Sequence, residues 1–192
     1  ARVICEKELG PEHPNTAASL NNLASLLVSM GRYEEARLLY ERALEIWEKA
    51  LDPQHPDTAA GRSNLAGLLQ TMGRYEEARA LYERRLAVLE EASGPESLDT
   101  ATGLNGLALA LWHMDKFEEA RPLYERALAI REKVLGPDHP DTAKSLNDFA
   151  GLLQSTGQYE EARPMLERAV AIREKALGLE HQTTALSLNN LA

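Results

Sequence analysis

The stretch SLNNLA at residues 19–24, followed by GRYEEA at residues 31–36, decides the fold of this 192-residue chain. The same pair of motifs returns at a constant step of 42 residues, without insertions. The copies are SNLA at 63–66 with GRYEEA at 73–78, LNGLA at 104–108 with FEEA at 117–120, LNDFA at 146–150 with GQYEEA at 157–162, and LNNLA at 188–192. Such self-similarity indicates a stack of repeated units, each too small to bury its apolar side alone.

Each repeat predicts two helices joined by a turn. In the LNDFAGLL segment, which starts at Leu146, apolar residues recur at i, i+3, i+4 and i+7, as on one face of a helix. This pattern predicts a first helix over residues 142–155. A second, longer helix is expected at positions equivalent to residues 33–51 of the first repeat. The predicted fold class is therefore all-α, an α-solenoid of antiparallel helix pairs.

The ends of the first helices carry two further signals. Asp141 stands where a side-chain oxygen is expected to cap the helix that follows, and Asn15, Asp57 and Asp99 occupy the same position. Glycine ends this helix in three repeats, where a left-handed backbone is usual. The third repeat has Asp115 at that point, so either this residue bears backbone strain or the turn changes.

The spacing divides the chain into four complete repeats and two half-repeats within one array, residues 1–192. The expected boundaries are 1–10 for a second helix without its first, 15–52, 57–94, 99–136 and 141–178 for the complete repeats, and 183–192 for a first helix without its second. Both ends therefore look cut from a longer protein. Each is expected to expose an apolar helix face through which copies could self-associate.

Two arginines interrupt apolar positions of the second repeat. Arg62 stands in the column that is leucine at positions 20, 104 and 146, and Arg85 stands in a column that is otherwise alanine. A guanidinium is too costly to bury without a partner. Each arginine must therefore reach solvent with its charged end or find a carboxylate.

Composition excludes several classes of function. The net charge of −9 argues against binding to nucleic acid or to an anionic membrane surface, because both need a basic surface. No run of about 18 apolar residues is present that could span a bilayer. The single cysteine, Cys5, cannot form an internal disulfide and fits a reducing compartment, so a cytoplasmic location is expected.

The recurring motifs resemble the kinesin-light-chain class of tetratricopeptide repeats. They are LNNLA, GxYxEA, RALxIxEK and LGxxHPDTA, and they cover essentially the whole chain. The resemblance implies a right-handed superhelix in which the first helix of each pair lines a concave groove. It also implies that a peptide or protein partner lies in that groove, with asparagines bonded to the partner's backbone.

The groove residues follow from two asparagine columns and the positions further along the same helix face. The candidates are Asn21, Asn22, Asn64, Asn105, Asn147, Asp148, Asn189, Asn190, Gln70, Trp112, His113, Lys144 and Gln154. An amide side chain offers donors and acceptors to an extended backbone. Alternatively, the asparagines bond the neighbouring helix and space the repeats. Trp112 and His113 could anchor a partner side chain, or Trp112 could be packing. By count the groove is nearly neutral, with Lys144 as its one clear basic residue.

Catalysis, metal binding and cofactors are not predicted. His13, His55, His139 and His181 recur once per repeat, too far apart to bind one metal ion, and they are expected to belong to loop structure. Adjacent pairs such as Glu34 and Glu35 point about 100° apart on a helix and cannot face one substrate. The sequence thus predicts a non-catalytic protein–protein interaction scaffold. The alternative is a structural spacer, or an end-to-end oligomerising module, of a larger protein.

Overall fold

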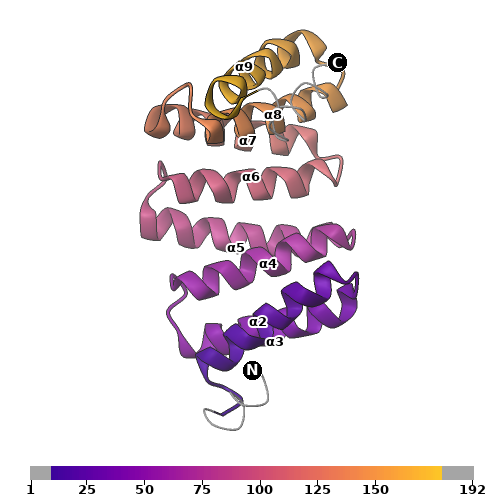
Figure 1. Ribbon diagram of the computed structural model, residues 1–192, viewed down its shortest axis with the longest axis vertical. Helices are drawn as coiled ribbons and strands as arrows, with labels where there is room; N and C mark the ends of the chain where they lie inside the picture. Colours follow the sequence, from indigo (N-terminus) through magenta and orange to yellow (C-terminus); the bar gives the residue numbers. More distant parts are fainter. Residues whose placement is uncertain (1–9, 179–192) are drawn as a thin grey trace. The chain divides into compact units, whose positions relative to one another are not determined.

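The computed structural model describes residues 10–178 and confirms an all-α fold of helix pairs in this range (Figure 1). The helices are α2 (Pro14–Ser29), α3 (Tyr33–Ala50), α4 (Pro56–Thr71), α5 (Tyr75–Ser93), α6 (Leu98–Trp112), α7 (Phe117–Leu135), α8 (Pro140–Ser155) and α9 (Tyr159–Leu177). The two half-repeats predicted at 1–10 and 183–192 fall almost entirely outside the described residues, as do Cys5, His181, Asn189 and Asn190.

The chain divides into two compact units, residues 1–92 and residues 93–192. In the first unit α2 packs along α3, and α3 packs on α4. In the second unit α6 pairs with α7 and α8 pairs with α9, while α7 joins the two pairs. Direct contacts also link α2 to α4 and α6 to α8. The first helices of successive repeats therefore lie side by side within each unit, which places their polar side chains on one face.

Small side chains allow this close approach. Alanine occupies matching positions of every first helix and of every second helix described, and these alanines are almost fully buried. They are Ala24, Ala66, Ala108 and Ala150 on the first helices and Ala36, Ala78, Ala120 and Ala162 on the second. Leucines one turn away complete the core, as at Leu27, Leu69, Leu111 and Leu153. The 42-residue period is thus a period of packing as well as of sequence.

The first helices begin earlier than predicted, and different residues cap them. His13, His55 and His139 are the N-caps, and each Nδ1 accepts the backbone N–H two residues on, at 3.1 Å, 3.2 Å and 3.1 Å. In the third repeat Ser97 caps α6 by accepting the N–H of Thr100 at 3.1 Å. The prediction that Asn15, Asp57, Asp99 and Asp141 are caps is wrong. Proline fits the first helical position because it needs no acceptor there, so the helix starts before these residues.

A buried threonine ties each loop to the helix that follows. Thr16, Thr58, Thr100 and Thr142 are fully buried. Their hydroxyls donate to the carbonyl six residues earlier, at 2.9 Å, 3.4 Å, 2.8 Å and 2.9 Å respectively. These bonds satisfy a buried hydroxyl and a loop carbonyl together. Sequence reasoning did not assign this role to the threonine of the PDTA motif.

The turn after α6 confirms the first of these alternatives, backbone strain at Asp115. Gly31, Gly73 and Gly157 have a φ of +74° in the equivalent turns, and Asp115 has a φ of +56°. Residues with a Cβ rarely adopt this left-handed conformation, although aspartate tolerates it better than most. The turn geometry is therefore retained in the third repeat at a local cost in free energy.

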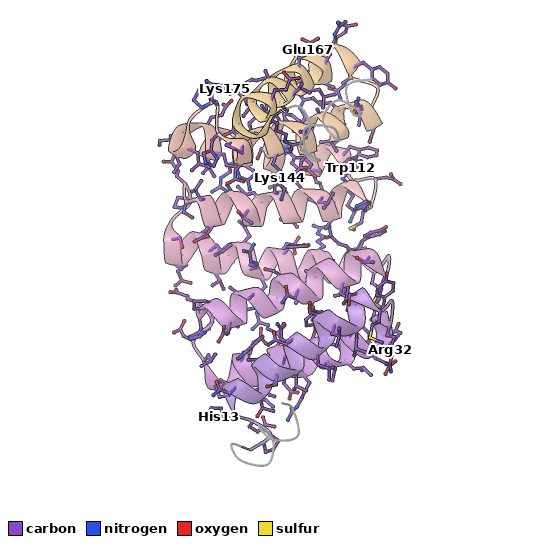
Figure 2. The ribbon with its side chains drawn as sticks, in the orientation of Figure 1. His13, Arg32, Trp112, Lys144, Glu167 and Lys175 are labelled. Atoms are coloured by element: carbon purple, nitrogen blue, oxygen red, sulfur yellow. The ribbon has the colours of Figure 1, made fainter. Side chains whose placement is uncertain are left out.

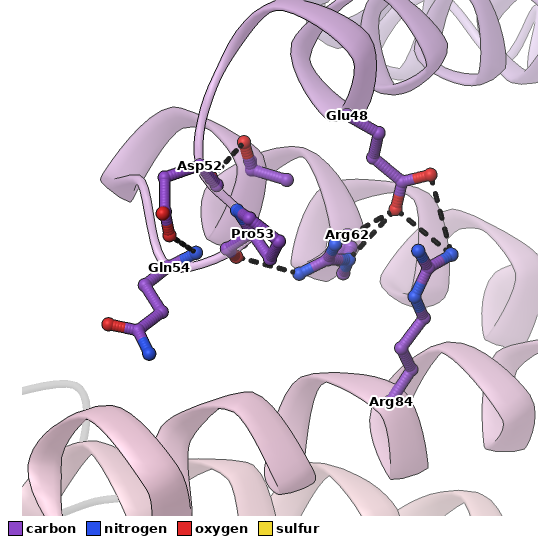
Figure 3. Close-up of polar contacts among 7 residues, drawn as sticks. Glu48, Asp52, Pro53, Gln54, Arg62 and Arg84 are labelled. Atoms are coloured by element: carbon purple, nitrogen blue, oxygen red, sulfur yellow. Dashed lines mark hydrogen bonds and ion pairs between the residues drawn. The ribbon is translucent and has the colours of Figure 1, made fainter.

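Arg62 finds the carboxylate that its burial requires (Figure 3). The side chain is 1% exposed, and its Nε and Nη2 donate to Glu48 Oε1 on α3 at 3.1 Å and 2.9 Å. Its Nη1 donates to the carbonyl of Pro53 at 3.1 Å. Arg84 on α5 also pairs with Glu48, at 3.1 Å. Glu48 thus compensates two guanidinium groups and links α3, α4 and α5. Arg85, the other arginine at an otherwise apolar position of this repeat, is half-buried.

Candidate functional site

The two asparagine columns meet between successive first helices. In the first unit, Asn64 on α4 donates through Nδ2 to Asn21 Oδ1 on α2 at 3.0 Å. In the second unit, Asn105 on α6 donates through Nδ2 to Asp148 Oδ2 on α8 at 2.7 Å. A residue of the first column therefore bonds a residue of the second column in the next repeat. This pattern supports the alternative in which the columns space the repeats.

The remaining candidates differ in their access to solvent. Asn22, His113 and Lys144 are exposed, and Gln154 is half-buried. Asn147 is 8% exposed and donates to the carbonyl of Ala143 at 3.2 Å, so its amide group is directed at its own helix.

Two further candidates contact a neighbouring helix of their unit. Gln70 is half-buried and accepts from the hydroxyl of Tyr82 at 3.0 Å. Trp112 bridges α6 and α8: its Nε1 donates to Ser155 Oγ at 3.0 Å, and its ring covers Gly151. The ring stacks with that of His113 at a centroid distance of 6.0 Å. Trp112 thus serves in part as packing between the helices, and His113 is the surface member of the pair.

A buried arginine completes this region and was missed from the sequence. Arg131 on α7 is 6% exposed and donates to Ser145 Oγ on α8 and, at 3.4 Å, to Thr102 Oγ1 on α6. Its contacts in the described part of the chain include no ion pair, in contrast to those of Arg62. Burial lowers the pKa of Arg131, and Asp141 and Asp148 partly offset this effect.

We call the polar surface between α6 and α8 the α6/α8 face, defined by Thr102, Asn105, Trp112, Lys144, Asp148 and Ser155. Each of these side chains is exposed or half-buried. Figure 2 labels Trp112 and Lys144 along the boundary between the two helices. Three hydrogen-bonded rungs cross this boundary: the Arg131 contacts, the Asn105–Asp148 bond and the Trp112–Ser155 bond.

More cations act on Asp148 than the sequence count of the groove suggested. Burial raises the pKa of the Asp148 carboxyl, and Lys144, Arg131 and Arg173 each act in the opposite direction. Burial also lowers the pKa of Arg173 on α9. Three cations therefore act on one half-buried carboxylate. Lys144 is the exposed basic residue among the groove candidates, whereas both arginines come from the second helices, which the count left out.

These helix pairs define the chain as a helical-repeat protein. A family model described as Tetratricopeptide repeat matches residues 1–49, 22–91, 99–175 and 142–192. The chain therefore belongs to the tetratricopeptide repeat family. Repeats of this family generally mediate protein–protein interaction and are typically non-catalytic. No curated protein sequence matches the chain.

Solved structures confirm the resemblance to kinesin-light-chain repeats. A variant of nearly identical TPR-like repeats, from a Podosopora anserina protein described as a kinesin light chain, is 31% identical with a TM-score of 0.81; the match covers 91% of this chain and 82% of that chain. A second structure of such repeats from the same source gives 32% identity, a TM-score of 0.77, and coverage of 93% and 85%. BtubC (BKLC) from P. vanneervenii is 27% identical with a TM-score of 0.78, and the match covers 99% of this chain and 75% of that chain.

No helix among the described residues has the length and the apolar character needed to cross a lipid bilayer.

Proposed function

We propose that the chain is a non-catalytic interaction module whose α6/α8 face binds an extended protein segment that carries an acidic side chain. The supporting observation is Arg131, a buried guanidinium whose hydrogen bonds among residues 10–178 reach two neutral hydroxyls and no carboxylate. A buried cation that hydrogen-bonds no carboxylate is unfavourable in a low dielectric, and Asp141 and Asp148 offset this cost only in part. An acidic group bound above it would therefore gain electrostatic free energy.

The cations have different roles in this proposal. Lys144 is exposed and can contact an acidic side chain directly. Arg131 is buried and Arg173 is half-buried, so both contribute mainly through an electrostatic field that water screens only weakly. Trp112 and His113, at the C-terminal end of α6, supply aromatic area for an apolar side chain of the same segment.

A peptide array with a matched pair of variants tests the proposal. Lys144→Ala removes a charge from the α6/α8 face, and Lys175→Ala removes the same charge from α9, where Lys175 pairs with Asp138 at 3.2 Å. Binding of glutamate-containing peptides is expected to weaken in the first variant and to persist in the second. Equal loss in both variants, or in neither, contradicts the proposal.

A structural spacer remains the second candidate, because the Asn21–Asn64 and Asn105–Asp148 bonds use groove amides to join repeats. Leu26 on α2 and Met30, the C-cap that follows it, are also more than half exposed, so they offer apolar area to a second copy of the chain. Light scattering over a range of concentrations distinguishes this function: a mass that rises with concentration and is unchanged by Lys144→Ala favours self-association.

A further inference from the structure

Asp148 is the one carboxylate in its column. The equivalent positions of the other repeats hold Asn22, Asn64, Gly106 and Asn190, all without charge. Asparagine at this position already forms the inter-repeat bond in the first unit, where Asn64 bonds Asn21. The carboxylate is therefore not needed for stacking, and its charge calls for a separate explanation.

Two successive rungs of the α6/α8 face place Asp148 next to the cations. Arg131 bonds Thr102 and Ser145, and the Asn105–Asp148 bond lies three residues further along each helix. Three residues are close to one helical turn, so the two rungs are neighbours. Lys144 lies four residues before Asp148, on the same side of α8.

The electrostatics agree with this geometry. Lys144, Arg131 and Arg173 are the three cations that lower the pKa of Asp148 against the effect of burial. In return, Asp148 opposes the lowering of the pKa that burial causes in Arg131 and Arg173. Asp148 is thus a shared counter-ion within the second unit.

We propose that Asp148 is a built-in competitor that sets the charge specificity of the α6/α8 face. Its carboxylate partly neutralises the positive potential of Lys144, Arg131 and Arg173, which would otherwise attract an acidic side chain of a partner. Its negative charge also repels that side chain. An acidic segment then binds the face only where its other contacts compensate for this repulsion. Asp148 is thus a repulsive element of specificity. This inference rests on the proposed function of the same face.

The test compares glutamate peptides with their glutamine counterparts on one array. Asp148→Asn installs the residue that the column has at positions 22 and 64, and it retains an acceptor for Asn105. Asp138→Asn is the matched control, because it removes one carboxylate from the loop before α8. We expect Asp148→Asn to raise the glutamate-to-glutamine binding ratio by about fivefold and Asp138→Asn to leave it unchanged. Asp148→Ser is the second variant if the first is poorly folded.

The outcomes separate the inference from the proposed function. Binding that weakens in Lys144→Ala but shows the same ratio in wild type, Asp148→Asn and Asp148→Ser overturns the inference alone. A ratio that falls in the Asp148 variants overturns it as well. Binding that is absent, or indifferent to Lys144→Ala, overturns the proposed function and this inference with it.

Discussion

Trp47 on α3 lies against Gly61 on α4 so closely that a Cβ at position 61 would be 2.9 Å from two of its ring carbons. The equivalent positions of the second unit hold Arg131 and Ser145, which are hydrogen-bonded. In both units a large side chain of a second helix meets a small residue of the next first helix. This size match positions the helices on which the two asparagine columns lie.

The contact between Trp47 and Gly61 predicts opposite effects for two alanine substitutions in α4. Gly61→Ala is expected to lower the free energy of unfolding by about 1–2 kcal/mol, because the clash exceeds the gain in helix propensity. Gly67→Ala is the control, since a Cβ there would contact nothing within 4 Å. It is expected to raise stability by up to about 1 kcal/mol. Urea denaturation measures both; equal effects contradict the packing account.

The strained turn after α6 predicts a stabilising substitution. Asp115→Gly is expected to raise the free energy of unfolding by about 0.5–1 kcal/mol, because glycine adopts a φ of +56° without a Cβ penalty. Gly73→Asp, in the equivalent turn of the second repeat, should lower it by a similar amount. Thermal denaturation followed by circular dichroism checks the pair, and a destabilised Asp115→Gly variant would show that the aspartate has a stabilising contact.

The ion pair between Arg62 and Glu48 should lose different amounts of stability when one or the other partner is replaced. Arg62→Leu restores the leucine of positions 20, 104 and 146 and leaves Glu48 paired with Arg84, so a change of at most about 1 kcal/mol is expected. Glu48→Gln leaves a buried guanidinium without its carboxylate and should cost about 3 kcal/mol. Chemical denaturation of both variants tests this. A larger loss for Arg62→Leu would mean that the arginine stabilises the fold beyond its charge.

The raised pKa of Asp148 predicts that the difference in stability between wild type and Asp148→Asn depends on pH. Its pKa is raised in the folded chain, so the folded state binds the proton more tightly than the unfolded state. This carboxyl therefore favours folding below its unfolded pKa of about 3.9, and the contribution is lost as pH rises through the folded pKa. Asp148→Asn should be more stable than wild type at pH 7, and this advantage should shrink towards pH 3. Denaturation at several pH values measures it; a growing advantage at low pH contradicts the sign.

The period, the helix pairs and the strained turn could be predicted from the sequence because each depends on local residue patterns. The helix caps could not, because a histidine before proline reads as loop until its Nδ1 is placed near a backbone N–H. The pairing of Asn105 with Asp148 joins residues 43 positions apart, so it depends on the register between two helices.

The position of the Arg131 guanidinium could not be predicted for a related reason. It lies on a second helix, in a column that holds Trp47 and Leu89 in earlier repeats, and only packing directs its guanidinium towards α6 and α8. The sequence does carry one signal of this site: positions 131 and 173 are arginine, whereas no other repeat has a charged residue in this column.

Amide chemical-shift mapping tests the binding face most directly. A glutamate-containing peptide selected on the array would be titrated into the isotope-labelled chain, with the Trp112 indole N–H as an additional probe. We predict that the perturbed signals cluster at Thr102, Asn105, Lys144 and Asp148. A cluster around Glu167 and Lys175 on α9 instead, with the α6/α8 face unperturbed, would contradict it.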